Sequence, residues 1–388
     1  MTRLIDTWIK DIDNGNIIGT VFLDLKKAFD LVDHKILLYK LKLYHFSPKS
    51  ISLFTSYLSG RKQQVKAGNV QSEFMDIKSG VPQGSILGPL LFLIYINDIA
   101  YSCPDLNIDL YADDSTLFKA DTELSKVESH LQSNLNCISK WCTYNNMALH
   151  PQKTKCMVIG SKQKLRGENH LTLKVNDCVL ENVNSQKVLG VYIDCQLSWR
   201  THIDFVCRNL NNKISLLKHI LYYLTDEMKQ MYYNAYLVPI FDYCITIWGK
   251  PNKSSINKVN NLQKRAARLI LNKPIRTPTP GLFKQLKWLS FSNRCKYHTS
   301  ILVYKTLNNM APSYMTEIIS FSKNDHYSLR SVKHNDLVLK KKPKTQFFKD
   351  SFSYYSIFIW NEIPCNIRNS SSVQSFKSKY RTYLFNKN

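Results

Sequence analysis

Two adjacent carboxylates, Asp113 and Asp114, stand between two short apolar runs of the sequence. Apolar runs on either side of such a pair are typical of a β-hairpin that carries both side chains at its tip. A third carboxylate, Asp24, lies inside the apolar segment 21–25, which has the composition of a strand. A buried carboxylate is costly unless it is paired or binds a metal, and Mg²⁺ prefers such oxygen ligands, so the three aspartates predict a magnesium site. For the Asp-Asp pair alone, an ordinary turn is the alternative, because aspartate favours turns.

The charge of the chain is unevenly distributed along the sequence. The whole chain has 53 basic and 29 acidic residues, a net charge of +24, but residues 1–160 contain 17 basic and 16 acidic residues. The stretch 251–300 contains 11 basic residues and no acidic ones. A surface whose charges only keep a protein soluble usually contains both basic and acidic residues. The absence of acidic residues from this stretch therefore favours nucleic-acid binding.

Length and composition exclude several classes of protein. With 388 residues and 44% apolar residues, the chain is expected to be globular, with two or three domains. No apolar run approaches the roughly 20 residues of a membrane span. The first residues lack a signal-peptide pattern, so an intracellular protein of the nucleus or cytoplasm is expected. The ten cysteines include no Cys-x-x-Cys pair, which argues against a zinc site and for reduced structural cysteines.

The apolar periodicity predicts an α+β fold with an antiparallel sheet. Strands are expected at 16–25, on both sides of Gly68-Asn69, in the hairpin around Asp113, at 156–160, and in a second small sheet around 171–175 and 187–193. Asp33 and Ser47 are predicted helix N-caps, because each precedes an apolar-periodic segment. Further helices are expected from Pro89 to about Ile96 and over 122–145, 202–222, 226–240, 255–272 and 294–308. A polar, basic tail over 321–353 contains the cluster Lys340–Lys344.

Three segments occur in the order of polymerase motifs A, B and C, namely 22–30, 80–85 and 111–114. The stretch 80–98 reads GVPQGSILGPLLFLIYIND and is by itself a specific signature. The chain resembles the reverse transcriptases of LINE-type (non-LTR) retrotransposons, of the jockey and CR1 kind. This resemblance implies a right-hand polymerase palm, followed by a mostly helical, basic thumb and C-terminal region.

The resemblance also implies a division of the chain. The palm with motifs A to E is expected over 1–195, a helical thumb-like basic region over 196–280, and a basic C-terminal region of retrotransposon type over 281–388. Only about twenty residues precede Asp24. The fingers are therefore expected to be largely missing, together with the N-terminal endonuclease of such elements.

The resemblance implies an RNA-directed DNA polymerase that adds deoxynucleoside triphosphates to a DNA primer along an RNA template, with two Mg²⁺ ions, or Mn²⁺ in their place. Asp24, Asp113, Asp114 and the main-chain carbonyl of Leu25 are the expected metal ligands. Lys153, in a segment that resembles motif D, is the expected general acid for pyrophosphate. Its alternative is an exposed lysine that protects a strand edge.

Further residues are expected to bind the nucleotide: Phe29, Gln83, Gly84 and Tyr111. In similar enzymes an aromatic at the position of Phe29 lies under the sugar and excludes a 2′-hydroxyl. A core phenylalanine is the alternative, and both roles are compatible because such a gate must be rigidly packed. For Gln83 the alternative is a solvated loop side chain.

Two more regions are expected to hold the nucleic acid. Leu189, Gly190 and Val191 resemble the primer grip of motif E, for which a plain strand is the alternative. A cationic helix face and the loop after it are expected to contact phosphates through Lys264, Arg265, Arg268, Lys273 and Arg276. A solvated face is the alternative. The Lys340–Lys344 cluster is typical of a nuclear-import signal, a phosphate contact or a disordered linker.

Two other functions stay open at this point. The second hypothesis is an inactive retrotransposon relic, which binds nucleic acid without catalysis because the fingers are missing. An RNA-directed RNA polymerase is the third hypothesis, and Phe29 argues against it. The sequence predicts no membrane partner and leaves the oligomeric state open.

Overall fold

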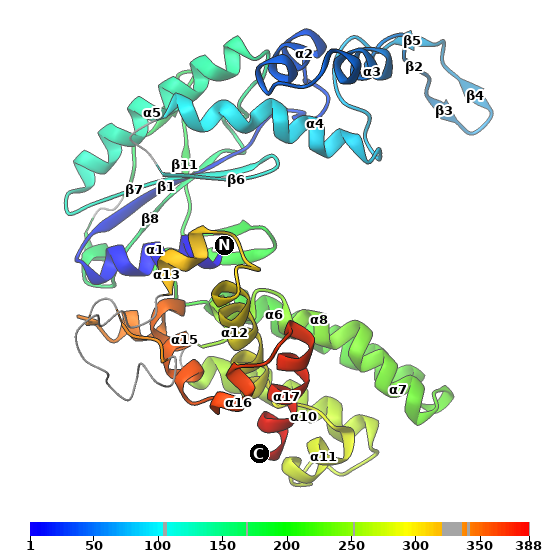
Figure 1. The fold of residues 1–388 in the computed structure, drawn as a ribbon, viewed down its shortest axis with the longest axis vertical. Coiled ribbons are helices and arrows are strands. Elements are labelled where there is room, and N and C mark those ends of the chain that lie inside the picture. The colour runs from blue at the N-terminus through cyan, green and yellow to red at the C-terminus, as the bar shows by residue number, and fades with distance from the viewer. Residues whose placement is uncertain (104–106, 168–169, 251–252, 320–335, 340–341, 388) are drawn as a thin grey trace. The chain divides into compact units, whose positions relative to one another are not determined.

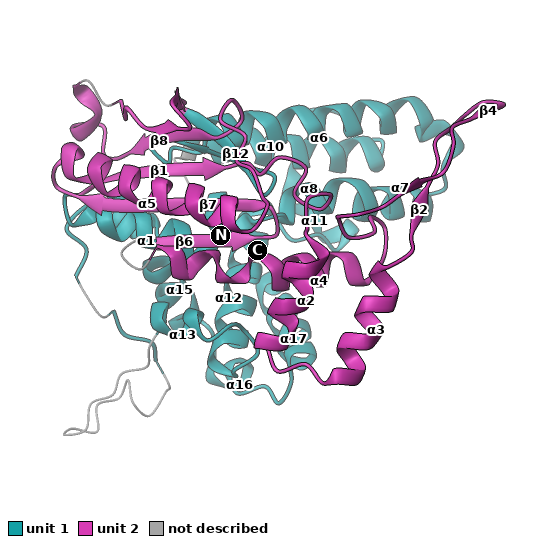
Figure 2. Cartoon of the chain, turned by 90° about the horizontal axis from the view of Figure 1, so that it is seen from above, with its two compact units in different colours: residues 1–15, 185–388 teal, residues 16–184 magenta. Residues whose placement is uncertain are grey.

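The computed structural model describes residues 1–388 apart from 104–106, 168–169, 251–252, 320–335, 340–341 and 388. The chain forms two compact units, which Figure 2 shows in different colours. Residues 16–184 form one, here called the sheet unit. Residues 1–15 and 185–388 form the other, here called the helical unit. Much of the predicted basic tail, including Lys340 and Lys341, lies outside the described residues.

A five-stranded sheet forms the centre of the sheet unit, in the order β11-β8-β1-β7-β6. Its strands are β1 (Ile17–Leu23), β6 (Asn107–Tyr111), β7 (Asp114–Asp121), β8 (Lys155–Ile159) and β11 (Glu181–Asn182). β1 pairs antiparallel with β7 and β8, and β6 pairs antiparallel with β7. β11 runs parallel to β8 at the edge. The predicted α+β class with a mainly antiparallel sheet is therefore confirmed.

The central strand β1 is buried along its whole length. Helix α5 (Leu124–Tyr144) packs against β1 and β7 (Figure 1), and its buried residues recur every three or four positions. The helix comes very close at Gly19, where an added Cβ would lie 2.4 Å from Val127 Cγ1 and 2.7 Å from Leu131 Cδ1. Gly19 therefore lets α5 pack directly on the strand backbone, and the predicted helix 122–145 is confirmed.

Helices α2 (His34–Leu43) and α3 (Pro48–Leu58) begin at the two predicted caps. Asp33 Oδ1 accepts hydrogen bonds from the backbone N–H groups of Lys35 and Ile36, at 2.8 and 3.0 Å. Ser47 Oγ accepts from the Ser50 N–H at 3.2 Å. These side chains satisfy donors of the first helical turn that have no partner within the helix, which explains where both helices start.

The segment after α3 forms the predicted hairpin around Gly68-Asn69, in two short pieces. β2 (Lys62–Gln63) pairs with β5 (Met75–Asp76), and β3 (Lys66–Ala67) pairs with β4 (Val70–Gln71). Helix α4 (Leu87–Ile96) then begins two residues before the predicted start at Pro89 and continues into the 3-10 helix η1 (Asn97–Ser102).

A buried lysine connects four of these helices, α2, α4, η1 and α5. Lys40 of α2 donates to the backbone carbonyl of Tyr95 at 2.6 Å and to Asp98 Oδ1 at 2.8 Å. Its ammonium also lies 4.9 Å from the centre of the Trp141 ring of α5, and Trp141 Nε1 donates to Asp98 at 3.2 Å. Burial lowers the pKa of Lys40, and its hydrogen bond with Asp98 opposes this shift. The cation is therefore retained inside the unit by hydrogen bonds and ring contact.

The prediction of one second small sheet, around 171–175 and 187–193, is wrong. β9 (Lys174–Val175) pairs with β10 (Cys178–Val179), and β12 (Ser185–Val188) pairs with β13 (Val191–Asp194), as separate hairpins. Each turn consists of two residues with positive φ, Asn176-Asp177 in the first and Leu189-Gly190 in the second. Such turns favour pairing with the adjacent strand over a more distant one.

The helical unit contains the remaining helices. They are α1 (Thr2–Asp13), α6 (Arg200–Ile220), α7 (Asp226–Tyr232), α8 (Val238–Asp242), α9 (Ile245–Trp248), α10 (Lys253–Ile270), α11 (Thr279–Leu286), α12 (Phe291–Leu307), α13 (Tyr314–Ile318), α15 (Phe352–Asn361), α16 (Cys365–Arg368) and α17 (Val373–Asn386). The predicted helices 202–222, 255–272 and 294–308 correspond to α6, α10 and α12. The predicted helix 226–240 is α7 and α8, joined by a π-helical turn, η4 (Tyr233–Leu237). Among the described residues, no helix is long and apolar enough to cross a membrane.

Helix α1 is far in sequence from the segments it contacts, and the sequence analysis assigned no element to it. Asp6 Oδ1 accepts from the Ser353 N–H at 2.8 Å, at the start of α15. Asp13 accepts from the backbone N–H groups of Lys344 and Thr345. Helix α1 is thus attached to the segment 344–353 by the buried carboxylates of Asp6 and Asp13.

His202 of α6 is hydrogen-bonded to β13, the second strand of the β12–β13 hairpin. The ring is buried, Nδ1 accepts from the Tyr192 N–H at 3.4 Å, and the ring lies edge-on to Trp248 at 5.2 Å between centroids. Burial lowers the pKa of His202 to about 4. The imidazole is therefore neutral in the folded protein at neutral pH.

Gly19→Ala is expected to destabilise the sheet unit by about 1–3 kcal/mol, because the new methyl group overlaps two core side chains of α5. Chemical denaturation, followed by circular dichroism, measures this change. Gly160→Ala is the matched control, since its Cβ would meet ordinary contacts at 3.5 Å or more at the end of β8. Equal stability of the two variants would contradict the tight contact at Gly19.

The stability of the helical unit is expected to fall as the pH decreases from about 6.5 to about 4. The folded pKa of His202 lies below that of an unfolded histidine, so the unfolded chain binds the additional proton in this window. His202→Asn retains a hydrogen-bond acceptor and does not titrate. The difference in unfolding free energy between wild type and variant should change by up to about 1.4 kcal/mol per pH unit. A difference that stays constant with pH would contradict this assignment.

Candidate active site

The predicted Asp-Asp hairpin forms at the junction of β6 and β7. Tyr111 pairs with Asp114, so that Ala112 and Asp113 form the turn. Ala112 has φ +52°, in the left-handed region that short hairpin turns use. Asp113 and Asp114 are both exposed. The prediction that these carboxylates lie at the tip of a hairpin is confirmed.

Asp24 lies at the same end of the sheet. The β1–β7 pairing ends with Leu23 opposite Ser115, and Asp24 and Asp114 are the next residues on the two strands. The pKa of Asp114 is raised, first by burial and then by the negative charges of Asp113 and Asp24. The three carboxylates are therefore close enough to repel one another, as neighbouring acids do.

The repulsion among these carboxylates would be relieved by a bound cation, so the site can be compared with known metal sites. Within the described ranges, no group of three or more His, Cys, Asp or Glu side chains is arranged to hold a metal ion. The three aspartates supply oxygen ligands of the kind that Mg²⁺ binds, but they do not form a ready-made cage. A cation at this end of the sheet would lower the pKa of Asp114, because it would offset the charges that raise it.

The segment after α5 fixes the end of β1. The Asp24 C=O accepts from the His150 N–H at 2.8 Å, and the Asp24 N–H donates to Thr154 Oγ1 at 3.2 Å. Leu25 forms a bridge with Leu149, flanked by the bond from His150 and by a bond from the Lys26 N–H to the Ala148 carbonyl at 2.8 Å. Because alternate backbone groups of a strand point to opposite sides, the Leu25 carbonyl faces away from Leu149.

Lys153 lies on the same segment as Thr154. Its backbone N–H donates to the His150 carbonyl at 3.1 Å, and its side chain is exposed. The turn that carries Lys153 is therefore hydrogen-bonded to Asp24, through His150 and Thr154. Thr154, which is fully buried, is a supporting residue that the sequence analysis did not identify.

The loop of motif B is attached to the end of motif A. The Gly80 N–H donates to the Val32 carbonyl at 2.8 Å, and the Val81 N–H donates to the Phe29 carbonyl at 2.9 Å. Gly80 has φ +90°, and an added Cβ would lie 2.9 Å from the Asp30 carbonyl oxygen. Only glycine fits this conformation and this approach without strain.

Two of the predicted nucleotide-binding residues are held by this arrangement. Gln83 Nε2 donates to Asp30 Oδ1 at 2.8 Å, although both side chains are exposed. The Phe29 ring is half-buried and lies 4.5 Å from Phe92, between ring centroids. Asp30 lies within motif A but was given no role from sequence, because nothing in the sequence pairs it with a residue 53 positions away.

The other two, Gly84 and Tyr111, are exposed. Gly84 has φ +80° and lies next to Gln83 in the loop, with no heavy atom within 4 Å of an added Cβ. Tyr111 ends β6 opposite Asp114 and has 66% of its surface exposed. Both residues are therefore available for a ligand on the sheet unit.

The predicted primer-grip residues lie in the helical unit. Leu189 and Gly190 form the turn of the β12–β13 hairpin, and Val191 begins β13. Tyr243 Oη donates to the Leu189 carbonyl at 2.5 Å, and its ring is 3.3 Å from where a Cβ of Gly190 would lie. The turn is therefore rigidly supported within its own unit.

The predicted phosphate-binding residues lie on α10 and on the loop before α11. Arg265 is exposed and donates to Asn211 Oδ1 at 3.2 Å. Arg268 donates through Nε and Nη2 to the Thr277 carbonyl, at 3.2 and 3.1 Å. Arg268 thus holds the loop, while Lys273 and Arg276 are exposed on it and Lys264 is half-buried.

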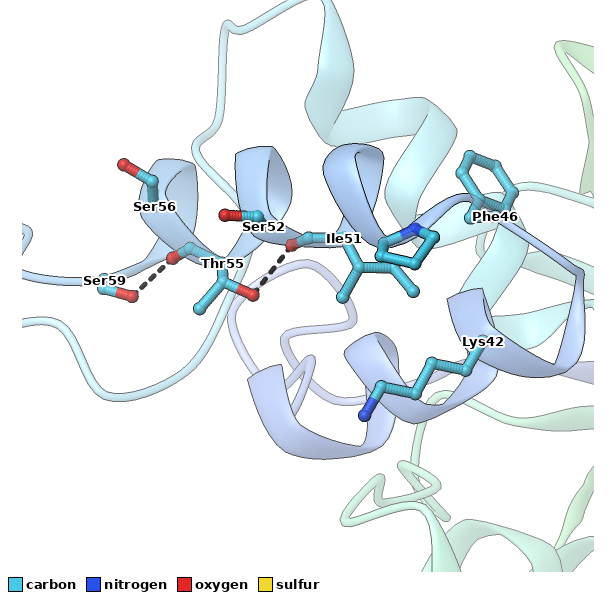
Figure 3. Close-up of a pocket in the computed structure, with 8 residues that line it drawn as sticks. Lys42, Phe46, Ile51, Ser52, Thr55, Ser56 and Ser59 are labelled. Carbon is cyan, nitrogen blue, oxygen red and sulfur yellow. Dashed lines mark hydrogen bonds between the residues drawn. The ribbon is translucent and has the colours of Figure 1, made fainter.

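A hollow of about 720 Å³ on α2 and α3 lies away from these residues (Figure 3). Thr55 Oγ1 donates to the Ile51 carbonyl at 2.8 Å, and Ser59 Oγ donates to the Thr55 carbonyl. These two hydroxyls thus bond to the backbone of their own helix, and we assign this hollow no role in the site.

A family model described as reverse transcriptase (RNA-dependent DNA polymerase) matches residues 7–193. The chain is 28% identical over 310 residues to the probable RNA-directed DNA polymerase from transposon BS of Drosophila melanogaster, which is 77% of this chain and 34% of that protein. It is 28% identical over 282 residues to the RNA-directed DNA polymerase from mobile element jockey of Drosophila funebris, covering 70% and 30% of the two chains. The chain spans about a third of the length of these curated relatives. Residues 7–193 therefore match the reverse transcriptase family, and the chain is similar to RNA-directed DNA polymerases of transposable elements.

Proposed function

We propose that this chain supplies the catalytic core of an RNA-directed DNA polymerase, which adds deoxynucleotides to the 3′-hydroxyl of a DNA primer along an RNA template. The main supporting observation is the position of Asp24, Asp113 and Asp114 at one end of the sheet, where their charges interact. The names of the relatives, RNA-directed DNA polymerases of transposons, agree with this chemistry.

Asp24, Asp113, Asp114 and the carbonyl of Leu25 would hold two Mg²⁺ ions, or Mn²⁺ in their place. Bound there, such ions activate the primer hydroxyl and neutralise charge on the leaving pyrophosphate. The protein contributes by fixing the carboxylates at the ends of paired strands, through the hydrogen bonds of Asp24 to His150 and Thr154. Lys153, on the same turn, would donate a proton to the leaving group.

The incoming nucleotide would lie against the loop that joins motifs A and B. The contact between Phe29 and Phe92 holds the Phe29 ring in one place, as the exclusion of a 2′-hydroxyl requires. The Asp30 carboxylate orients the Gln83 amide, which would then face the nucleotide. Gly84 permits close approach of the backbone, and the exposed ring of Tyr111 provides a surface beside Asp114.

We further propose the polymerase division of the chain, with a palm over 1–195, a thumb-like region over 196–280 and a C-terminal region over 281–388. In this division the turn Leu189-Gly190-Val191 contacts the primer. The cationic residues on α10 and the following loop contact phosphates without reading sequence. The supporting observation is the rigid backing of that turn by Tyr243.

A second candidate function is nucleic-acid binding without catalysis. The observation that favours it is the lack of a preformed group of three metal-ligating side chains among the described residues. The acid-free stretch 251–300 would then provide the affinity. Such binding weakens steeply with salt, because it releases counterions from the phosphates.

Asp113→Asn is expected to abolish primer extension by this chain on a poly(rA)/oligo(dT) substrate with dTTP and Mg²⁺, with a loss of more than about 100-fold. The substitution removes a carboxylate charge where a metal would bind and retains the shape of the turn. The measurement is the amount of extended primer on a gel.

Asp121→Asn is the matched control for this experiment, because it lies at the far end of the same strand, β7. Undiminished extension by Asp113→Asn would contradict the proposed role of Asp113. No extension by the wild-type chain, combined with salt-sensitive binding of the substrate, would favour the second candidate function.

Phe29→Val is expected to raise incorporation of ribonucleotides relative to deoxynucleotides by about tenfold or more, because a smaller side chain leaves room for a 2′-hydroxyl. Single-nucleotide incorporation with dTTP and with UTP measures the ratio. Phe92→Leu removes the ring that supports Phe29 but keeps the Phe29 side chain, so it is expected to raise the ratio by less than Phe29→Val does. An unchanged ratio in Phe29→Val would exclude Phe29 as the gate.

A further inference from the structure

A hollow of about 750 Å³ lies within the helical unit, between α10, α11 and the end of α17. Its walls include three aromatic side chains, Phe283, Trp288 and Phe385, and two lysines, Lys264 and Lys284. Its volume is in the range of pockets that bind small organic ligands. Lys264, already described as a predicted phosphate contact, lines it, whereas none of the candidate metal-binding or nucleotide-binding residues does.

The aromatic wall is rigid. Trp288 is 4% exposed and stacks on Tyr233, with ring centroids 3.4 Å apart and ring planes at 10°. Phe283 lies 6.1 Å from the Trp288 ring, between centroids, so Trp288 supports it from behind. Phe283 and Phe385 are half-buried, and they present the aromatic surface of the hollow. A preformed aromatic surface stacks a planar ring at little entropic cost, and a nucleobase is such a ring.

The charge of the hollow is positive. Lys264 and Lys284 form no ion pair with any described residue, and no acidic residue lines the hollow. The stretch 251–300, which supplies most of the lining, contains no Asp or Glu. The ligand is therefore expected to be an anion.

The first turn of α11 adds to this preference. Thr279, Pro280 and Gly281 begin the helix and line the hollow. Backbone N–H groups at the start of a helix carry partial positive charge and favour phosphate. An added Cβ at Gly281 would meet no heavy atom within 4 Å, so the backbone there borders open space.

We propose that this hollow binds one nucleotide of a single-stranded nucleic acid, with the base against the half-buried rings of Phe283 and Phe385 and the phosphate near Lys264 and Lys284. An aromatic surface beside two cations matches a nucleotide, which carries a flat ring and an anion a few bonds apart. The inference rests on the proposed function only in that the partner is nucleic acid, because it requires neither the aspartates nor a metal.

The test is binding of fluorescein-labelled rU8 and dT8 to the full chain, measured by fluorescence anisotropy in EDTA. EDTA removes the divalent metal that the proposed catalysis needs. Binding is therefore measured independently of primer extension, and the two proposals can fail separately. Stronger binding of rU8 would assign the hollow to the RNA strand, and stronger binding of dT8 to the DNA strand. Either result supports the proposal if the variants below weaken it.

Lys284→Glu is expected to weaken binding about tenfold more than Lys287→Glu does. The two variants make the same change in charge three residues apart, and Lys287 does not line the hollow. Gly281→Leu is expected to weaken binding by about tenfold without any change in charge, because its side chain fills the open space. Circular dichroism of each variant checks that the helices are retained.

Competition defines the ligand class. UMP or dTMP should displace the labelled strand, whereas inorganic phosphate at the same concentration should not. Equal effects of Lys284→Glu and Lys287→Glu, with no effect of Gly281→Leu, would overturn the proposal in favour of a diffuse basic surface. Displacement by poly-glutamate as effective as that by UMP would also overturn it, since the site would then recognise charge alone.

Discussion

The contact between helix α5 and strand β1 at Gly19 constrains the whole sheet unit. β1 is the central strand, buried along its length and paired on both sides, and its backbone touches α5 where a side chain would overlap Val127 and Leu131. Because the side-chain alternation of a strand has a period of two, this contact fixes which residues of β1 face the helix. β1 ends in register with β7, with Leu23 opposite Ser115.

The position of the carboxylates follows from that register. Asp24 is the first residue after β1 and Asp114 is the first residue of β7, so the pairing of Leu23 with Ser115 brings the two acids together. The sheet keeps these like charges close, and the pKa of Asp114 is raised first by burial and then by the charges of Asp113 and Asp24. The arrangement of the three aspartates therefore depends on the packing of α5 on β1, which lies away from the carboxylates themselves.

Local signals in the sequence predicted local structure well. The caps at Asp33 and Ser47, the helix 122–145 and the Asp-Asp hairpin all formed as expected, because each depends on residues within a few positions of one another. The same analysis missed the Lys40–Asp98 network and the hydrogen bond from Gln83 to Asp30, which join residues more than 50 positions apart. It also placed 171–175 and 187–193 in one sheet, whereas two-residue turns with positive φ paired each strand with its neighbour. The roles of the site residues came from family resemblance, since exposed side chains such as Tyr111 and Lys153 have no packing pattern that identifies them.

The attachment of α1 to residues 344–353 has a consequence for how this protein is made. The sheet unit is inserted into the helical unit, since the chain leaves the helical unit after residue 15 and returns to it at residue 185. During synthesis, α1 emerges from the ribosome more than 300 residues before the segment that supplies the N–H groups for Asp6 and Asp13. Its buried tryptophan and two buried carboxylates therefore lack their final surroundings until that segment has emerged, whereas the sheet unit is complete in sequence earlier. The helical unit is thus expected to close after the sheet unit.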